Sequence, residues 1–273
     1  MARLGVIAGG GDLPHRLADH ARASGRDVFI LGLKGFAKPD LVKQFGGAEA
    51  AMGEIGKGIR LLKDAECDEV VFAGTVKRPD LSALKFDLQG ASLLPELVAA
   101  ASKGDDALLR VVLGAFEKAG FRVIGADDVL ASLLAPAGPL GSRTPRSEDW
   151  ADIRAAAQAA AEIGAQDIGQ GAVARSGAVV ATEAADGTDA MLKHIAPTDR
   201  PSGVLVKRPK PQQERRIDLP TIGLATVRNA RAAGLAGVAV EAGAALVMNG
   251  AEVGAEADRL GLFVYGFTTG ELA

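Results

Sequence analysis

The sequence has few of the residues that form disulfides or histidine-based metal sites. Its 273 residues include one cysteine, Cys67, and three histidines, His15, His20 and His194. One cysteine excludes an intrachain disulfide, and histidines so widely separated do not indicate a histidine-based metal cluster. The first residues lead directly into a strand pattern without a signal-peptide profile. We therefore expect a cytoplasmic protein.

Long apolar runs and a large net charge are also missing. No apolar run approaches the roughly 20 residues that a membrane-spanning helix needs, so any contact with a membrane should be peripheral. The formal net charge of -3 gives no general attraction to nucleic acid, which is not an expected partner. With 48% apolar residues the chain has ample material for a core, in one large domain or two ordinary ones.

The first half of the chain alternates between strand-like and helical patterns. Strand-like runs cover residues 4–8, 27–31, 69–72 and 121–124. Helical patterns cover residues 13–24, 56–65, 93–102 and 106–119. This alternation is typical of a parallel α/β sheet. It predicts a Rossmann-like, nucleotide-binding N-terminal domain over residues 1–134.

The loops after these strands carry the first candidate binding residues, because the trailing loops of parallel strands gather at one ligand-binding edge. The candidates are Gly10, Gly11, Asp12, Leu13, Ala73, Gly74, Thr75, Lys103, Gly104, Asp105, Asp106 and Ala126. Lys77, Arg78, Pro79 and Asp127 would line the same cleft. Two alternatives stay open: the glycines only make a tight strand–helix turn, and Asp105 or Asp106 is a plain helix N-cap.

The first loop does not carry an intact dinucleotide fingerprint. Gly9 and Gly11 are followed by Pro14 where the third glycine should stand, and residues 32–34 lack the acidic group expected to bind a ribose. An NAD-dependent oxidoreductase is therefore the less favoured alternative.

The second half predicts another α/β domain, with a mixed sheet. Residues 135–146 are rich in proline, glycine and small polar residues, and we interpret them as a linker before a domain at 147–273. The predicted elements of this domain are a helix at 147–163, a hairpin of 171–175 and 178–183, a helix at 190–195, strands at 204–206, 237–240, 244–248 and 262–265, and helices near 221 and at 252–260.

Three carboxylates lie close together after the hairpin. Glu183, Asp186 and Asp189 fall within seven residues, with Gly187 among them and a predicted helix behind. Such a group could hold a hard divalent cation or an activated water. The alternative is an Asx-type turn that caps the helix.

A basic stretch precedes a predicted helix at residues 203–227. Its charged residues are Lys207, Arg208, Lys210, Arg215, Arg216 and Asp218. Cations next to the free N–H groups of a helix start favour an anion such as phosphate. The alternative is a solvated charged loop.

Taken together, the motifs follow the order of one known family. They are residues 5–14 (GVIAGGGDLP), 71–79 (VFAGTVKRP), 103–106 (KGDD), 167–170 (DIGQ), 183–192 (EAADGTDAML), 203–207 (GVLVK) and 218–223 (DLPTIG). The chain resembles, over its whole length, the bacterial UDP-2,3-diacylglucosamine pyrophosphatases of lipid A biosynthesis, of the type unrelated to calcineurin-like phosphoesterases. The patterns of calcineurin-like enzymes and the Nudix box are absent from the sequence.

The resemblance implies a Mg²⁺-dependent homodimer that splits UDP-2,3-diacylglucosamine into UMP and 2,3-diacylglucosamine 1-phosphate, also called lipid X. Our hypothesis assigns catalytic roles to position 225 and to Thr188, Asp189, Lys207 and Asp218, with an arginine near Lys207 as the alternative cation. Asp189 and Glu183 would bind the metal, and Gly187 would contact the substrate. We expect the uridine and diphosphate in the N-terminal cleft and the acyl chains in the second domain, in contact with the cytoplasmic face of the inner membrane.

One position departs from the family pattern. The family has an acidic residue two places after Gly223, where this sequence has Ala225. We interpret Ala225 as the replacement of a catalytic aspartate, because alanine can neither orient water nor hold magnesium. Natural variation within a helix is the alternative, and a nucleotide-sugar-binding protein without activity is a further one.

Overall fold

The computed structural model describes residues 2–77, 80–198 and 200–273, which form two compact units. Unit 1 comprises Met1–Ala131 and Glu214–Asp218, and unit 2 comprises Ser132–Gln213 and Leu219–Ala273. The N-terminal unit therefore includes a short segment from late in the chain.

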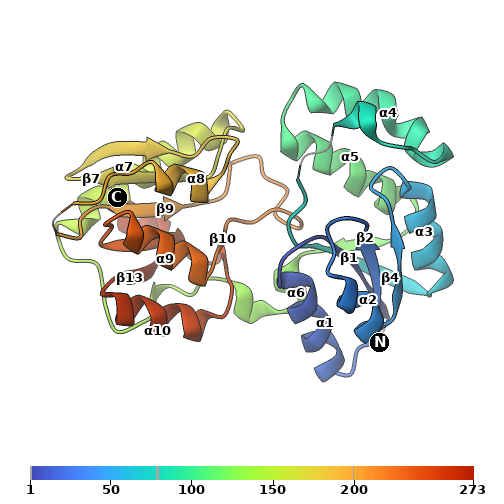
Figure 1. Ribbon diagram of the computed structural model, residues 1–273, viewed down its shortest axis with the longest axis horizontal. Helices are drawn as coiled ribbons and strands as arrows, with labels where there is room; N and C mark the ends of the chain where they lie inside the picture. Colours follow the sequence, from blue (N-terminus) through green and yellow to red (C-terminus); the bar gives the residue numbers. More distant parts are fainter. Residues whose placement is uncertain (1, 78–79, 199) are drawn as a thin grey trace. The chain divides into compact units, whose positions relative to one another are not determined.

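Unit 1 is built on a five-stranded parallel sheet with the order β3-β2-β1-β4-β5 (Figure 1). Its strands are β1 (Arg3–Ala8), β2 (Val28–Leu33), β3 (Gly47–Ala50), β4 (Cys67–Ala73) and β5 (Arg122–Ile124). The strand order reverses between β1 and β4, which makes the loops after these two strands the expected edge for ligands. The Rossmann-like pattern predicted from the sequence is confirmed.

The helices of unit 1 connect the strands in the manner of a doubly wound fold. They are α1 (Leu13–Ala23), α2 (Pro39–Phe45), α3 (Ile55–Asp64), α4 (Leu88–Ala101), α5 (Asp105–Lys118) and α6 (Ala126–Val129), with the short 3₁₀ turn η1 (Leu81–Ala83). A second 3₁₀ turn, η2 (Ala131–Leu133), contains the boundary between the two units in the sequence. Apolar residues of α3, α4 and α5, among them Ile59, Leu97 and Phe116, share one core with Val70 of β4. Burial of these side chains holds the three helices on the sheet.

The segment Glu214–Asp218 is attached to α5. Asp106 is 7% exposed, and its Oδ1 accepts a hydrogen bond of 2.6 Å from the backbone N–H of Glu214. Arg216 donates to Glu214 Oε1 at 2.8 Å and to Glu117 Oε1 at 2.7 Å. Ile217 packs against the core of the unit. A buried hydrogen bond, ion pairs and an apolar contact thus hold this short segment on unit 1.

Unit 2 contains a six-stranded mixed sheet with the order β6-β13-β11-β9-β7-β8. Its strands are β6 (Gly138–Pro139), β7 (Gly171–Arg175), β8 (Ala178–Thr182), β9 (Val204–Lys207), β11 (Gly237–Glu241) and β13 (Phe263–Phe267). The strands β9, β11 and β13 are parallel, whereas β6, β7 and β8 pair antiparallel. The predicted mixed sheet is confirmed.

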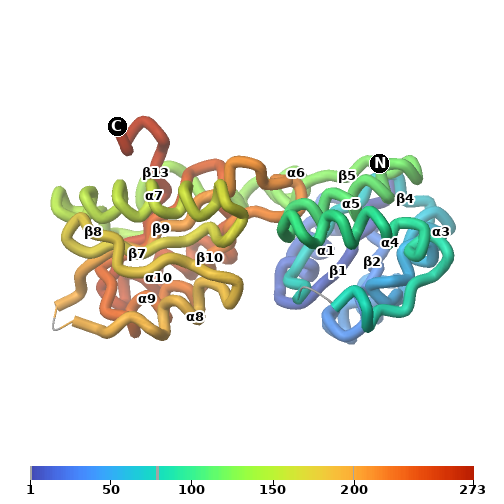
Figure 2. The backbone as a smooth tube through the Cα atoms, turned by 90° about the horizontal axis from the view of Figure 1, so that it is seen from above, coloured from blue at the N-terminus to red at the C-terminus, as the bar shows by residue number. Residues whose placement is uncertain are grey.

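Helices cover both faces of this sheet. They are α7 (Asp149–Ala165), α8 (Thr188–Lys193), α9 (Leu224–Ala232) and α10 (Gly250–Leu260), with the 3₁₀ turn η3 (Thr269–Leu272) at the end. Along β9, Val204 and Val206 join the core beneath α7, while Leu205 joins the core beneath α8, α9 and α10. Figure 2 shows α7 on one side of β7 and β9 and the other helices on the opposite side. Successive strand side chains point to opposite faces, so an apolar run serves two cores.

Several local predictions were wrong or incomplete. The segment 244–248 does not join the main sheet; β12 (Leu246–Val247) pairs instead with β10 (Thr221–Ile222). Because Thr221 and Ile222 form β10, the helix expected near Thr221 begins later, at Leu224. Ala126, expected in a loop, begins α6. Residues 135–146, predicted as a linker, are hydrogen-bonded within unit 2, where Leu140 N donates to Val264 O at 2.9 Å.

The Glu214–Arg216 pair predicts a specific pH dependence of stability. The hydrogen bond from Arg216 lowers the pKa of Glu214 below its ordinary value of 4.5. A lowered carboxyl pKa contributes stability that is present above 4.5 and is lost as the pH falls through the folded-state value. We expect Glu214→Gln to lower the free energy of unfolding by about 1 kcal/mol at neutral pH, after allowance for screening.

This difference should close under acid conditions, as measured by urea unfolding near neutral pH and well below the ordinary pKa. Glu96→Gln, an exposed position on α4, is the matched control and should change stability little at either pH. An equal loss of stability for Glu214→Gln at both pH values would contradict the assignment.

Candidate active site

The candidate site in unit 2 begins at the carboxyl end of β9. Lys207 is the last residue of this strand and is 7% exposed. Its Nζ donates a hydrogen bond of 3.4 Å to the carbonyl oxygen of Thr221, in the strand that leads into α9. A buried ammonium group next to the start of a helix suits a phosphate oxygen, because both groups favour negative charge.

Glu183 directly follows β8, and its carboxylate and the side chain of Lys207 both lie near Gly171 of β7, the strand between β8 and β9. It is 9% exposed, and its Oε2 accepts a hydrogen bond of 2.9 Å from Thr188 Oγ1. A Cβ added to Gly171 would lie 2.6 Å from Glu183 Oε2 and 3.6 Å from Lys207 Cγ. Gly171 therefore leaves the space that the Glu183 carboxylate occupies. The sequence places Gly171 in a strand but gives no sign of this packing role.

Asp189 and position 225 lie on neighbouring helix starts. Asp189 is in the first turn of α8, and its Oδ1 accepts a hydrogen bond of 2.8 Å from Asn229 Nδ2 on α9. Ala225 is exposed in the first turn of α9, one helical turn before Asn229. Residues four apart share one helix face. A longer side chain at 225 would thus lie on the face that meets Asp189. Asn229 was not a candidate from the sequence.

The expected capping alternatives do not account for these carboxylates. The N-cap of α8 is Gly187, with φ of 85°, and no side chain caps this helix start. The N-cap of α5 is likewise Gly104, and Asp106 is committed to the backbone of Glu214 instead. Neither the Asx-type turn nor the plain N-cap is therefore observed.

The basic stretch is largely neutralised by carboxylates. Arg208 lies 3.0 Å from Glu241, and Lys210 lies 2.5 Å from Asp167. Arg216 is held by Glu214 and Glu117, as described above. The pairs of Arg208 and Lys210 are partly buried and that of Arg216 with Glu117 is exposed, but all three cations have carboxylate partners, so the stretch is neither a solvated loop nor an open cluster of cations. Lys207 differs, because the hydrogen bond of its ammonium group is to a carbonyl oxygen.

The candidates near the start of the chain lie in unit 1. Gly10 N donates to Thr75 O at 2.8 Å, and Thr75 N donates to Gly10 O at 2.9 Å, so the loops after β1 and β4 are joined. A Cβ on Gly74 would lie 2.3 Å from Gly10 O, which explains the glycine there. The tight-packing interpretation thus holds for part of this loop. Gly11, with φ of 84°, lies open.

The remaining candidates of unit 1 differ in what they can offer. Ala73 and Ala126 are buried small residues that could contribute only backbone groups, and Leu13 begins α1. Asp12 is exposed and pairs with Lys38 at 2.5 Å, which lowers the pKa of Asp12. Lys103 is exposed between α4 and α5. Arg78 and Pro79 lie outside the described residues.

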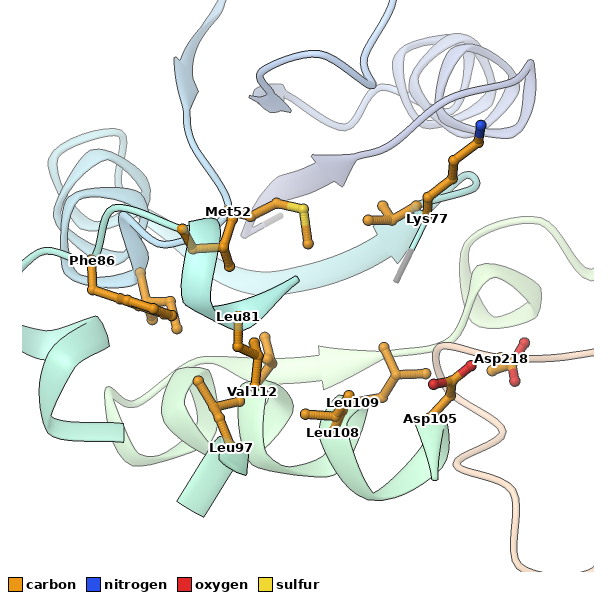
Figure 3. A pocket seen from close by; sticks show the side chains of 13 residues that line it. Met52, Lys77, Leu81, Phe86, Leu97, Asp105, Leu108, Leu109, Val112 and Asp218 are labelled. Carbon is orange, nitrogen blue, oxygen red and sulfur yellow. The ribbon is translucent and has the colours of Figure 1, made fainter. Parts of the chain in front are cut away.

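Asp218 belongs to unit 1 and not to the group around Lys207. It lines a pocket of about 290 Å³ together with Asp105, and Figure 3 shows both carboxylates at the same end of this pocket. The candidates from the sequence therefore fall into two sets. The candidates in unit 2 are Glu183, Asp186, Gly187, Thr188, Asp189, Lys207, Arg208, Lys210 and Ala225, and the others belong to unit 1.

Within residues 2–77, 80–198 and 200–273, no group of three or more His, Cys, Asp or Glu side chains could hold a metal ion. Over the same ranges no helix is long and apolar enough to cross a bilayer.

Comparison with known proteins decides the family. The family model described as "LpxI N-terminal domain" matches residues 3–133, and the one described as "LpxI C-terminal domain" matches residues 136–265. The chain belongs to the LpxI family. The resemblance seen in the sequence motifs is thereby confirmed.

A curated LpxI relative covers almost the whole chain. The UDP-2,3-diacylglucosamine pyrophosphatase LpxI of Caulobacter vibrioides is 51% identical over 274 residues, which cover 97% of this chain and 98% of the relative.

Two solved structures show a remote likeness to this LpxI family member. A UDP-glucose-4-epimerase from Stenotrophomonas maltophila with bound NAD is 17% identical, with a TM-score of 0.31 over 44% of this chain and 35% of that one. A CobK precorrin-6A reductase is 16% identical, with a TM-score of 0.34 over 98% of this chain and 88% of that one. Scores this low carry no argument about function.

The packing at Gly171 predicts a measurable coupling. Gly171→Ala should displace the Glu183 carboxylate and break its hydrogen bond with Thr188, lowering the free energy of unfolding by about 1–2 kcal/mol. In a Glu183→Ala background the same methyl group should cost much less, because the colliding group is gone.

Gly250→Ala is the matched control, since a Cβ there meets nothing closer than 4.0 Å and the residue begins α10. It should leave stability unchanged or raise it by a few tenths of a kcal/mol. Urea unfolding of the four variants measures these differences. Strict additivity of Gly171→Ala and Glu183→Ala would contradict the assigned packing.

Proposed function

We propose that this chain hydrolyses the pyrophosphate bond of UDP-2,3-diacylglucosamine, giving UMP and 2,3-diacylglucosamine 1-phosphate in lipid A biosynthesis. The observation that carries the proposal is the 51% identity, over nearly the full length of both chains, to a protein named for this activity. The buried Lys207 beside the start of α9 supports it, because pyrophosphate hydrolysis develops negative charge on phosphate oxygens.

The groups in unit 2 have complementary roles in this proposal. The Lys207 ammonium stabilises negative charge on the phosphate undergoing attack. Thr188 holds the Glu183 carboxylate through its hydrogen bond, and Asn229 holds Asp189. We propose that Asp218 and the loops of unit 1, which include Gly10, Thr75 and Lys103, contact the rest of the substrate.

A magnesium ion fits these residues only in combination with the substrate. Glu183 uses Oε2 and Asp189 uses Oδ1 in hydrogen bonds, so each carboxylate can offer its second oxygen. Mg²⁺ commonly binds through one or two carboxylates together with substrate phosphates, which agrees with the absence of a three-carboxylate group among the described residues. Glu183 and Asp189 would hold the ion, which would neutralise phosphate charge when bound.

We propose that Ala225 makes this chain a poor catalyst. Its methyl group is exposed at the start of α9, on the face that carries Asn229 and meets Asp189. A carboxylate there could accept a proton from water or orient it, and a methyl group can do neither. The same observation supports the second candidate function, a nucleotide-sugar-binding protein without turnover. No observation favours NAD-dependent oxidation.

We also propose a homodimer in peripheral contact with the cytoplasmic face of the inner membrane, as the family resemblance implies. Sedimentation of the purified chain, with and without vesicles of anionic phospholipid, would test both points.

Replacement of Ala225 tests the proposed function most directly. Release of UMP from UDP-2,3-diacylglucosamine is measured for the unchanged chain and for Ala225→Asp, with Mg²⁺ and with a chelator. We expect the Ala225→Asp form to be faster by at least about 10²-fold, because a catalytic group typically contributes that much. This gain should require the metal.

Ala225→Asn is the matched control, since it adds similar bulk without a charge, and it should remain slow. If the unchanged chain and Ala225→Asp turn the substrate over equally fast, another residue must supply the catalytic carboxylate. Inactivity of every form, with the lipid still bound, would support the binding protein and contradict the hydrolase.

A further inference from the structure

Unit 1 contains an apolar pocket that the proposed reaction does not explain. It has a volume of about 290 Å³ and lies among the start of α3, the η1 turn, α4 and α5. Its lining residues are Met52, Ile55, Val76, Lys77, Leu81, Leu84, Phe86, Leu97, Asp105, Leu108, Leu109, Val112 and Asp218. All of these belong to unit 1.

The lining is apolar on nearly all sides. Leu81, Leu97 and Val112 come from three different elements, and Figure 3 shows them grouped around the same space. An apolar space of this size is unfavourable when filled with water, because its walls offer water few hydrogen-bond partners. The occupant that this lining favours is a hydrocarbon.

The size of the pocket limits the occupant. An engineered apolar cavity of about 150 Å³ holds one benzene molecule of six carbons. By this measure a pocket of about 290 Å³ holds about 12 carbon atoms. A single medium-length alkyl chain has this size, whereas two such chains or a uridine with its phosphates do not fit an apolar space of this volume.

The charged residues at the pocket decide which kind of alkyl chain it accepts. Two carboxylates, Asp105 and Asp218, and one ammonium group, Lys77, are the charged groups of the lining. The carboxylates lie at one end, which would repel the head group of a free fatty acid. A chain attached through a neutral ester or amide avoids this repulsion.

We infer that this pocket binds one acyl chain of the diacyl lipid substrate. The inference rests on the proposed function for the identity of the lipid, and it places an acyl chain in unit 1 instead of the second domain expected from the sequence. Asp218, which the attached segment Glu214–Asp218 brings to unit 1, is part of the rim. Because the volume of the pocket limits the number of carbon atoms that it holds, the pocket also selects the length of the acyl chain.

A variant that fills the pocket tests this inference through binding. Val112→Trp places an indole among the lining residues, and Val98→Trp, on the 57% exposed Val98 of α4, is the matched control. Equilibrium binding is measured for UDP-2,3-diacylglucosamine with acyl chains of about eight and about 12 carbons. Thermal unfolding shows whether each variant is folded. If Val112→Trp does not fold, Leu81→Trp takes its place as the pocket variant.

We expect the pocket variant to weaken binding of the longer lipid by at least about tenfold, because about two methylene groups lose their apolar contacts. Binding of the shorter lipid should change less, and Val98→Trp should bind both lipids as the unchanged chain does. Unchanged binding of the longer lipid by a folded pocket variant would overturn the inference.

Two further results separate this inference from the proposed function. If free dodecanoate competes with the lipid as well as the lipid competes with itself, the pocket is a general alkyl site and the inference is overturned. If Ala225→Asp releases no UMP but the pocket variant still loses the longer lipid, the hydrolase proposal fails and the acyl pocket stands.

Discussion

Ion pairing along the stretch from Lys207 to Asp218 is a constraint that both units share. A charge that is withdrawn from water is unfavourable without a partner, and the more of it that is buried, the greater the cost. Arg208 pairs with Glu241 and Lys210 pairs with Asp167 within unit 2, whereas Arg216 pairs with Glu214 and Glu117 within unit 1. One stretch of chain thereby belongs to two cores.

The same ion pairing leaves Lys207 as the cation that we propose to contact the phosphate. Its neighbours in the sequence are neutralised by carboxylates, while its own ammonium group is buried and hydrogen-bonded to a carbonyl oxygen. Glu183 and Asp189 are held by Thr188 and Asn229 in the same unit. The charge that a phosphate would meet in this unit is thus concentrated at one group, and Ala225 stands where the sequence resemblance predicts a carboxylate.

Local patterns predicted the fold class well because the β-branched strands and amphipathic helices of both units carry strong signals. They failed where structure depends on partners distant in the sequence. β3 consists of Gly, Ala and Glu residues, and it is a strand only because it pairs with β2. Neither the attachment of Glu214 to Asp106 nor the space that Gly171 leaves for Glu183 has a signature in the sequence. The candidate site residues could be named from motifs, but the place of Asp218 in unit 1, with the segment Glu214–Asp218, could not.

The most direct test of this account compares two lysines in the Ala225→Asp form. Lys207→Met should lower turnover of UDP-2,3-diacylglucosamine by about 10²–10³-fold, as expected for loss of a group that stabilises developing charge. Lys210→Met should keep turnover within a few fold and lower stability by about 1–2 kcal/mol, because it leaves the partly buried Asp167 without this partner. Equal loss of turnover in the two variants, or full activity of Lys207→Met, would contradict the account.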